Sequence, residues 1–276
     1  MENALTGSDG LSIRSSGIWA EEKLYYLKHY LNIFSVGMHK KWPGKLYYVD
    51  LFSGPGKCHI RETGEEIDGS PLIALKFNFT KYFFFEADPS CYEALSKRIE
   101  TRAPEKLKHI SLIHGNCNEH IQEVRPPSAP SLGIVFIDPT GISQIAFDTI
   151  RTLTSERKMD LIINFPEGMG IRMNLHQYTE SEESALDVFM GTSNWKQRFH
   201  QIPTSFPQAC RQIANEYLEN LRSLGYQVLD DSQIPVRTTG NSLLYYLIFA
   251  SKNPKGNEFW KKIGLIDPKG QRKLFT

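Results

Sequence analysis

The chain has 276 residues, of which 40% are hydrophobic and 23% are charged, and its formal net charge is +1. This composition can bury a sizeable core, so it excludes a largely disordered chain, and the length suits one large α/β domain or two small ones. The nearly neutral charge gives no overall electrostatic attraction to nucleic acid or to an anionic membrane. No apolar run approaches the roughly 20 residues that span a bilayer, and the polar N-terminus has no signal-peptide core. We therefore expect a cytoplasmic protein that has no membrane part.

The cysteines and histidines show none of the spacings that hold metals. No two cysteines form a C-x-x-C pair, and no two histidines form an H-x-x-x-H pair. We expect four reduced thiols, without a disulfide framework and without a metal site. The cysteines are Cys58, Cys91, Cys117 and Cys210.

The N-terminal part of the chain predicts a leader, a helix and a strand. Residues 1–17 are rich in Gly and Ser, which predicts a flexible leader. A helix is predicted from about Trp19, because apolar residues recur every three or four positions and form one stripe. "KWPGK" at 41–45 then breaks the chain before a first strand at about 45–52. The stripe consists of Leu24, Leu27, Leu31 and Phe34.

Strands and helices are predicted to alternate over the next 120 residues. Four short, nearly continuous apolar runs follow the first strand, and each ends in an acidic residue, an amide, Gly or Pro. Strands that are buried on both faces have this pattern, and alternation with helices indicates right-handed βαβ units in a doubly wound sheet. The strands are predicted at 82–88, 109–116, 132–141 and 159–168, and the helices at 71–78, 89–102, 117–124 and 144–156.

The C-terminal third departs from this alternation. Residues 169–205 are polar and irregular and are predicted to form a small cap insertion, followed by a helix at 206–223. Two apolar runs, 226–237 and 243–253, are joined by "TTGNS", which suits an antiparallel hairpin. Five parallel strands and this hairpin make a seven-stranded, mostly parallel sheet. This architecture resembles the Rossmann-like class I S-adenosylmethionine-dependent methyltransferases, with residues 18–276 as one domain.

The end of the first predicted strand, "YYVDLFSGPGKC", carries an acid four residues before a G-P-G turn. This pattern resembles the first motif of the methyltransferases, with Phe52 in place of its first glycine. The resemblance implies that the backbone of Gly54, Pro55 and Gly56 approaches the methionyl part of the cofactor, and that Asp50 faces its ammonium. The alternative is a tight turn with a capping aspartate. A dinucleotide-binding enzyme is disfavoured, because the third glycine of G-x-G-x-x-G is missing.

The next two strand ends carry further candidates for cofactor binding. Glu86, followed by Ala87, ends the second strand, where a carboxylate can accept both hydroxyls of a ribose. Asn116 and Cys117 end the third strand, where the resemblance implies a contact with the adenine amino group. A simple helix cap is the alternative role for Asn116. The following Asp88-Pro89 pair is better explained as a helix start.

The fourth and fifth strand ends are expected to face the acceptor. Asp138 and Pro139 lie in "FIDPTG", where a carboxylate could orient a nucleophile or take its proton. Amino-directed nucleic-acid methyltransferases have D/N-P-P and an aromatic residue here, and this chain keeps only the first two residues. Either Asn164 or Glu167 in "NFPEG" could bind the acceptor, although an ordinary loop role explains them equally well.

An insertion separates the glycine turn from the next predicted helix. In most methyltransferases that helix begins directly after the turn, whereas here "KCHIRETGEEIDG" (57–69) precedes the helix start at Ser70-Pro71. "IRETGEEI" is predicted to form a small hairpin over the pocket, as a lid or an acceptor-recognition element. The alternative is a surface excursion that has no role.

Several motifs together resemble the three-Cys-motif partner proteins of bacteria. These are "W-x-x-x-K-L", "DLFSGPGKC", "TGEEIDGSPLIAL", "FIDPTG", "NFP", "FMGTSNW" and "YYLIFASKNPKG…W", and they span about 18–276. The resemblance implies a methyltransferase-like protein with S-adenosylmethionine as cofactor and a cysteine-containing partner protein. Residues 169–205 would be its cap, with Trp195 as a stacking residue for substrate or as a core anchor.

Two functions from different classes remain open at the level of sequence. The first is a methyltransferase that acts on a DNA or RNA base, because an aromatic residue in the position of Phe52 recurs among nucleic-acid methyltransferases. The second is a cofactor-binding but catalytically silent module of a mobile-element or defence system, which the missing aromatic residue after Pro139 favours.

Overall fold

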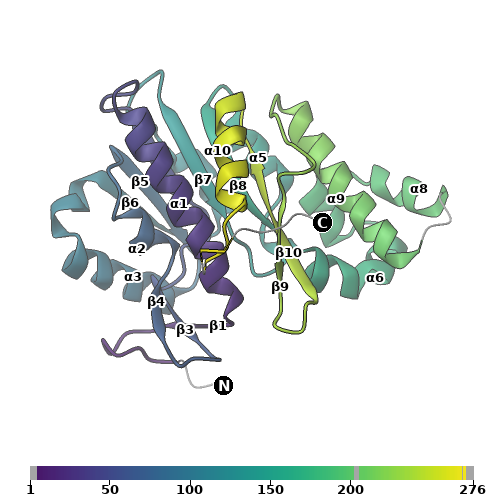
Figure 1. The fold of residues 1–276 in the computed structure, drawn as a ribbon, viewed down its shortest axis with the longest axis horizontal. Helices are drawn as coiled ribbons and strands as arrows, with labels where there is room; N and C mark the ends of the chain where they lie inside the picture. The colour runs from purple at the N-terminus through teal and green to yellow at the C-terminus, as the bar shows by residue number, and fades with distance from the viewer. Residues whose placement is uncertain (1–4, 202–204, 269, 272–276) are drawn as a thin grey trace.

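The computed structural model describes residues 5–201, 205–268 and 270–271. Its centre is a seven-stranded sheet with the order β6-β5-β2-β7-β8-β10-β9 (Figure 1). The first five strands in this order are parallel, and β10 runs antiparallel to both β8 and β9. The strands are β2 (Leu46–Asp50), β5 (Lys81–Glu86), β6 (Ile110–His114), β7 (Leu132–Ile137), β8 (Lys158–Phe165), β9 (Ile234–Arg237) and β10 (Leu243–Ala250).

This arrangement confirms the predicted fold class. It is the Rossmann-like fold of the class I methyltransferases, in which a mostly parallel sheet is closed by a C-terminal antiparallel hairpin. The predicted strand positions are confirmed to within a few residues, although the ladder part of the first hairpin strand is shorter than predicted and begins at Ile234.

Helices cover both faces of the sheet, because successive strand residues point to opposite sides. Leu46 and Tyr48 of β2 pack against one group of helices, whereas Tyr47 and Val49 pack against the other. The first group comprises α1 (Trp19–His39), α2 (Ser70–Ala74), α3 (Pro89–Arg102) and α10 (Pro254–Gly264). The second comprises α4 (Cys117–His120), α5 (Phe147–Thr154), α7 (Ala185–Met190) and α9 (Phe206–Ser223).

The predicted cap is helical. It begins with a π-helical turn at Glu167–Ile171 and a 3-10 turn at Arg172–Asn174, and continues with α6 (Leu175–Glu180), α7 and α8 (Asn194–Gln201). Of these, α6 and α8 lie with α9 beyond the β10 side of the sheet (Figure 1). Three further 3-10 turns connect the parallel strands, at Pro104–His109, Ile121–Glu123 and Ile142–Gln144.

The prediction of a flexible leader over residues 1–17 is corrected for residues 5–17, the part of it that the structure describes. Arg14–Ser16 form strand β1, which pairs in parallel with β3 (Lys57–Ile60). β3 in turn pairs with β4 (Glu66–Asp68) in an antiparallel hairpin, so the predicted hairpin within the insertion is confirmed. The Gly- and Ser-rich composition misled the prediction, because the partner strand of β1 lies more than 40 residues further along the chain.

Three smaller differences concern local structure. Helix α2 ends at Ala74 and is shorter than predicted. His114, in a strand predicted to be buried on both faces, is exposed and stacks on Tyr92. α10 was not predicted, although Asn253 caps it by accepting a hydrogen bond from the backbone N–H of Lys255. No helix in the described parts of the chain has the length and apolar character that crossing a membrane requires.

Candidate functional site

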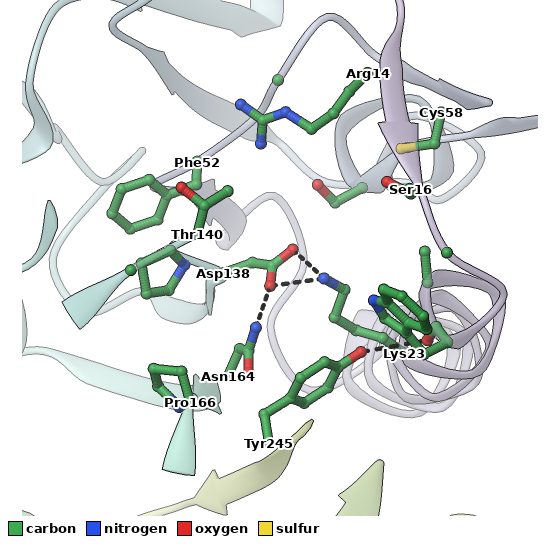
Figure 2. Close-up of a pocket in the computed structure, with 18 of the residues that line it drawn as sticks. Arg14, Ser16, Lys23, Phe52, Cys58, Asp138, Thr140, Asn164, Pro166 and Tyr245 are labelled. Atoms are coloured by element: carbon green, nitrogen blue, oxygen red, sulfur yellow. Dashed lines mark hydrogen bonds and ion pairs between the residues drawn. The ribbon is translucent and has the colours of Figure 1, made fainter. Parts of the chain in front are cut away.

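A cavity of about 530 Å³ lies beyond the carboxyl ends of β2, β7 and β8 (Figure 2). Two sets of residues enclose most of it. We call the first set the strand-end wall, which comprises 52–56, 138–143, 164 and 166. We call the second set the N-terminal wall, which comprises 14–17, 19–20, 23–24, 57–58 and 61. Gly69 and Ser70 at the start of α2, Gly170, Asn174 and Tyr178 of the cap, and Leu244 and Tyr245 of β10 complete the lining.

The turn at residues 54–56 in the strand-end wall has a backbone conformation that favours glycine at two positions. Gly54 and Gly56 have φ angles of 61° and 89°, in the region that other residues rarely adopt. A Cβ atom on Gly54 would meet only the Arg14 guanidinium, at 4.0 Å, so its backbone is open to the cavity. A Cβ on Gly56 would lie 3.0 Å from Leu95 of α3. Gly54 therefore permits close approach of a ligand, whereas Gly56 permits close packing of α3.

Asp50, predicted to face a cofactor ammonium, is fully buried and does not line the cavity. Its carboxylate accepts hydrogen bonds of 3.2 Å from the Phe52 backbone N–H and from the Tyr48 hydroxyl. Burial raises the pKa of Asp50 to about 7, although hydrogen bonds from Ser70 and Phe52 oppose this rise. Asp50 therefore fixes the start of the glycine turn from beneath.

Glu86 also supports the glycine turn. One of its oxygens accepts a 2.6 Å hydrogen bond from the Gly54 N–H, and the other accepts a 2.8 Å bond from the Asp88 N–H. Glu86 is buried and Ala87 is exposed, and neither lines the cavity. The structure thus places Glu86 beside the turn, as the strand order requires, with both oxygens bound by backbone.

Asn116 caps α4, which is the alternative role considered for it. Its side-chain oxygen accepts hydrogen bonds from the backbone N–H of Asn118, at 3.0 Å, and from the Asn118 side chain. The Asn116 side chain is exposed, whereas Cys117 is buried in the core below it. Neither residue lines the cavity.

Asp138 is the centre of a polar network at the floor of the cavity (Figure 2). Lys23 Nζ lies 2.6 and 2.7 Å from its two carboxylate oxygens, and Asn164 Nδ2 donates a 2.7 Å hydrogen bond to Oδ1. The contact with Asn164 follows from the register of β7 and β8, which pairs Ile137 with Ile163. The two strand ends that were expected to face the acceptor therefore lie in contact, and Pro139 lines the cavity beside them.

Lys23 was not among the predicted site residues. It lies in the first part of α1, and its ammonium also lies 5.5 Å from the centre of the Tyr245 ring. A signal was present in the sequence, because Lys23 falls three residues after Ala20 and four before Leu27, within the buried stripe of the helix. A cation in an apolar stripe requires a partner, which here is Asp138.

Glu167 and Trp195 do not reach the cavity. Glu167 is buried, and one of its oxygens lies 3.4 Å from Arg172 Nη2. Trp195 is in the core, where its indole N–H donates a 2.8 Å hydrogen bond to Asp187. The core-anchor alternative for Trp195 is therefore the one that the structure shows.

No arrangement of metal ligands occurs among the residues that the structure describes: no group of three or more His, Cys, Asp or Glu side chains could hold an ion.

Comparisons with known proteins show that the fold of this chain is similar to that of solved structures. No protein-family model matches the chain, and no curated protein matches it in sequence. The crystal structure of LPL1258 from Legionella pneumophila, of family DUF519, is similar with a TM-score of 0.53 and 12% identity, over 90% of this chain and 91% of that one. At this identity the likeness concerns the fold alone.

Two further solved structures give lower scores. The O-methyltransferase TomG from Streptomyces achromogenes, in complex with SAM, has a TM-score of 0.44 and 11% identity, over 84% of this chain and 80% of that one. TYW2 from P. horikoshii, in complex with MeSAdo, has a TM-score of 0.44 and 12% identity, over 90% and 70%.

Proposed function

We propose that the protein is an S-adenosylmethionine-dependent methyltransferase whose acceptor is a base of DNA or RNA. The observation that carries this proposal is that one cavity contains both the open glycine turn at Gly54 and the Asp138–Asn164 pair. Ligands of open α/β sheets bind at this edge, beyond the carboxyl ends of the strands. A volume of about 530 Å³ lies within the range of small-molecule sites.

The residues present fit the cofactor at its methionyl end. Gly54 leaves its backbone open to the cavity, and the turn is held from below by Asp50 and from the side by Glu86. Glu86 would bind the ribose and Asn116 the adenine, and both would then exchange a present hydrogen bond for one to the cofactor. When bound, the cofactor supplies an electrophilic methyl group, and the chain supplies binding and orientation.

The Asp138 network supports an acceptor that carries N–H groups. Asn164 Oδ1 is buried and has no hydrogen-bond partner among the described residues, which is costly unless a ligand supplies a donor. Asp138 is held on both oxygens by Lys23, so its carboxylate is fixed in place. These two groups would accept hydrogen bonds from an exocyclic amino group and orient it toward the methyl donor. Orientation alone supplies much of the acceleration in such transfers.

The aromatic lining supports a planar acceptor. Phe52, Trp19 and Tyr245 line the cavity, and the Arg61 guanidinium lies 5.3 Å from the Trp19 ring centre. Aromatic rings and arginine planes are the groups on which unstacked bases pack. The three-Cys-motif partner type, a cysteine-containing partner protein and a cytoplasmic location are proposed on the sequence motifs alone.

The catalytically silent module is the second candidate function. Asp138 is engaged by Lys23, and the "DPTG" loop lacks the aromatic residue of amino-directed enzymes, which together favour binding without transfer.

Calorimetry with S-adenosylmethionine and with NAD tests the cofactor assignment. We expect micromolar binding of the former, weakened at least tenfold by Glu86→Gln, and no binding of NAD. An Arg151→Gln variant, which alters an exposed residue on α5, serves as the control. Binding of NAD in place of S-adenosylmethionine would overturn the assignment.

Transfer of a tritiated methyl group to DNA, RNA and protein tests the activity. Asn164→Ala and Asp138→Asn are expected to lower transfer to nucleic acid at least 100-fold while cofactor binding persists. Cofactor binding by the wild type without transfer to any of these acceptors would establish the silent module instead.

A further inference from the structure

We infer that Arg14 of strand β1 binds the carboxylate of the cofactor's amino-acid moiety, so that the N-terminal segment forms part of the cofactor site. The inference rests on the proposed function, because it assigns one ligand group of that same cofactor. Its first support is position. The Arg14 guanidinium lies 4.0 Å from where a Cβ on Gly54 would be, and both residues line the same cavity.

The second support is charge. Three other cations line the cavity, and each has a partner: Lys23 pairs with Asp138, Lys57 with Glu66, and Arg61 lies over Trp19. The guanidinium of Arg14, by contrast, forms no hydrogen bond or ion pair with any residue that the structure describes. A guanidinium presents a planar fork of donors that matches a carboxylate. Arg14 and Arg61 therefore both have donors available, and Arg14 is the one of the two that lies beside Gly54.

The third support is the way in which β1 is fixed to the turn. Arg98 of α3 is 2% exposed and makes two 2.8 Å hydrogen bonds to the carboxylate of Asp9. The same guanidinium donates to the backbone carbonyl oxygens of Ser12, at 2.7 Å, and Pro55, at 2.5 Å. One buried side chain thus joins the segment before Arg14 to the glycine turn itself. The backbone that carries Arg14 is therefore fixed beside the glycine turn by this side chain and by the pairing of β1 with β3.

The chemistry of the strand-end wall favours Arg14 over that wall as the location of the carboxylate. Asp138 is already neutralised by Lys23, and the unpartnered oxygen of Asn164 offers a carboxylate a hydrogen-bond acceptor and no donor. An amino-acid group placed with its carboxylate toward Arg14 avoids that oxygen. The remaining source of an anion at Arg14 is a phosphate of the acceptor, and the two sources can be separated by experiment.

Calorimetry with two ligands tests the inference: S-adenosylhomocysteine and its decarboxylated analogue. For Arg14→Gln we expect a loss of about 10- to 100-fold in affinity for S-adenosylhomocysteine, the effect of a charge-assisted hydrogen bond, and no loss for the decarboxylated ligand. Arg14→Lys should recover part of the affinity, and Arg151→Gln should match the wild type. Unchanged affinity of Arg14→Gln for the decarboxylated ligand also shows that the site remains folded.

Three results would overturn the inference. Arg14→Gln could bind S-adenosylhomocysteine as the wild type does, or it could lose affinity equally for both ligands. It could also keep S-adenosylhomocysteine affinity and lose affinity for a single-stranded oligonucleotide, which would assign Arg14 to an acceptor phosphate. A wild type that binds neither nucleoside ligand would instead overturn the proposed function, and the inference with it.

Discussion

The two walls of the cavity differ in chemistry. The strand-end wall supplies the carboxylate, the amide and the open backbone: Asp138, Asn164 and Gly54. The N-terminal wall supplies all of the cations in the lining, which are Arg14, Lys23, Lys57 and Arg61. The parallel sheet thus provides orienting groups by its topology, whereas the segment before β2 and the insertion after it provide the charge that an anionic ligand requires. The cavity has both its orienting groups and its cations only where the two walls lie against each other.

Removal of Arg98 should separate the walls and have the largest effect. Arg98→Met leaves the Pro55 carbonyl oxygen and Asp9 without a buried partner, which we expect to lower the free energy of unfolding by about 3–5 kcal/mol. Urea denaturation measures the change. Arg102→Met on the same helix removes a more exposed guanidinium, 40% accessible, and should cost less than about 1 kcal/mol. Equal costs for the two variants would show that Arg98 does not join the walls.

The buried carboxyl of Asp50 should make stability depend on pH. Its pKa is raised from 3.8 to about 7, so the folded protein binds this proton more tightly than the unfolded chain. The Asp50 contribution to the free energy of unfolding therefore falls as pH rises from about 4 to about 7, by at most about 4 kcal/mol. Asp50→Asn should reduce this decline, measured by denaturation at a series of pH values. If the free energy of unfolding fell equally with pH in the wild type and the variant, groups other than Asp50 would cause the pH dependence.

The Lys23–Asp138 pair should couple the walls more weakly. The side chains are 14% and 19% exposed, so we expect a coupling of about 1–3 kcal/mol in a double-mutant cycle of Lys23→Met and Asp138→Asn. Free energies of unfolding of the two single variants and the double variant give this value. Strict additivity would mean that the ion pair does not contribute to joining the walls.

A single methyl group on the glycine turn should have the smallest effect on stability. Gly54→Ala forces alanine to a φ of 61°, and we expect a loss of about 1 kcal/mol. Gly141→Ala is the matched control in the same wall, because Gly141 is extended and a Cβ there would meet nothing within 4 Å. Thermal unfolding of both variants provides the comparison. An equal effect of the two substitutions would contradict the requirement for glycine at position 54.

The strand-end wall was largely predictable from the sequence. Asp138, Pro139, Asn164, Phe52, Gly54, Pro55 and Gly56 were predicted at strand ends, and all of them line the cavity. Asp50, Glu86 and Asn116 were placed at the correct strand ends as well. In the structure, however, Asp50 and Glu86 accept hydrogen bonds from the backbone of the glycine turn, and Asn116 caps a helix. Position along the chain therefore predicted which residues lie near the site, but it did not predict the hydrogen-bond partners of their side chains.

The sequence alone determined the alternation of strands and helices, the C-terminal hairpin and the glycine turn, because periodicity, turn residues and φ preferences act over a few residues. The residues of the N-terminal wall could be identified only from the tertiary structure. Arg14 reaches the site through pairing of β1 with β3, and Lys23 reaches it through an ion pair with a residue 115 positions away. Such contacts join residues that are far apart in the sequence, so the local sequence pattern around Arg14 does not predict them.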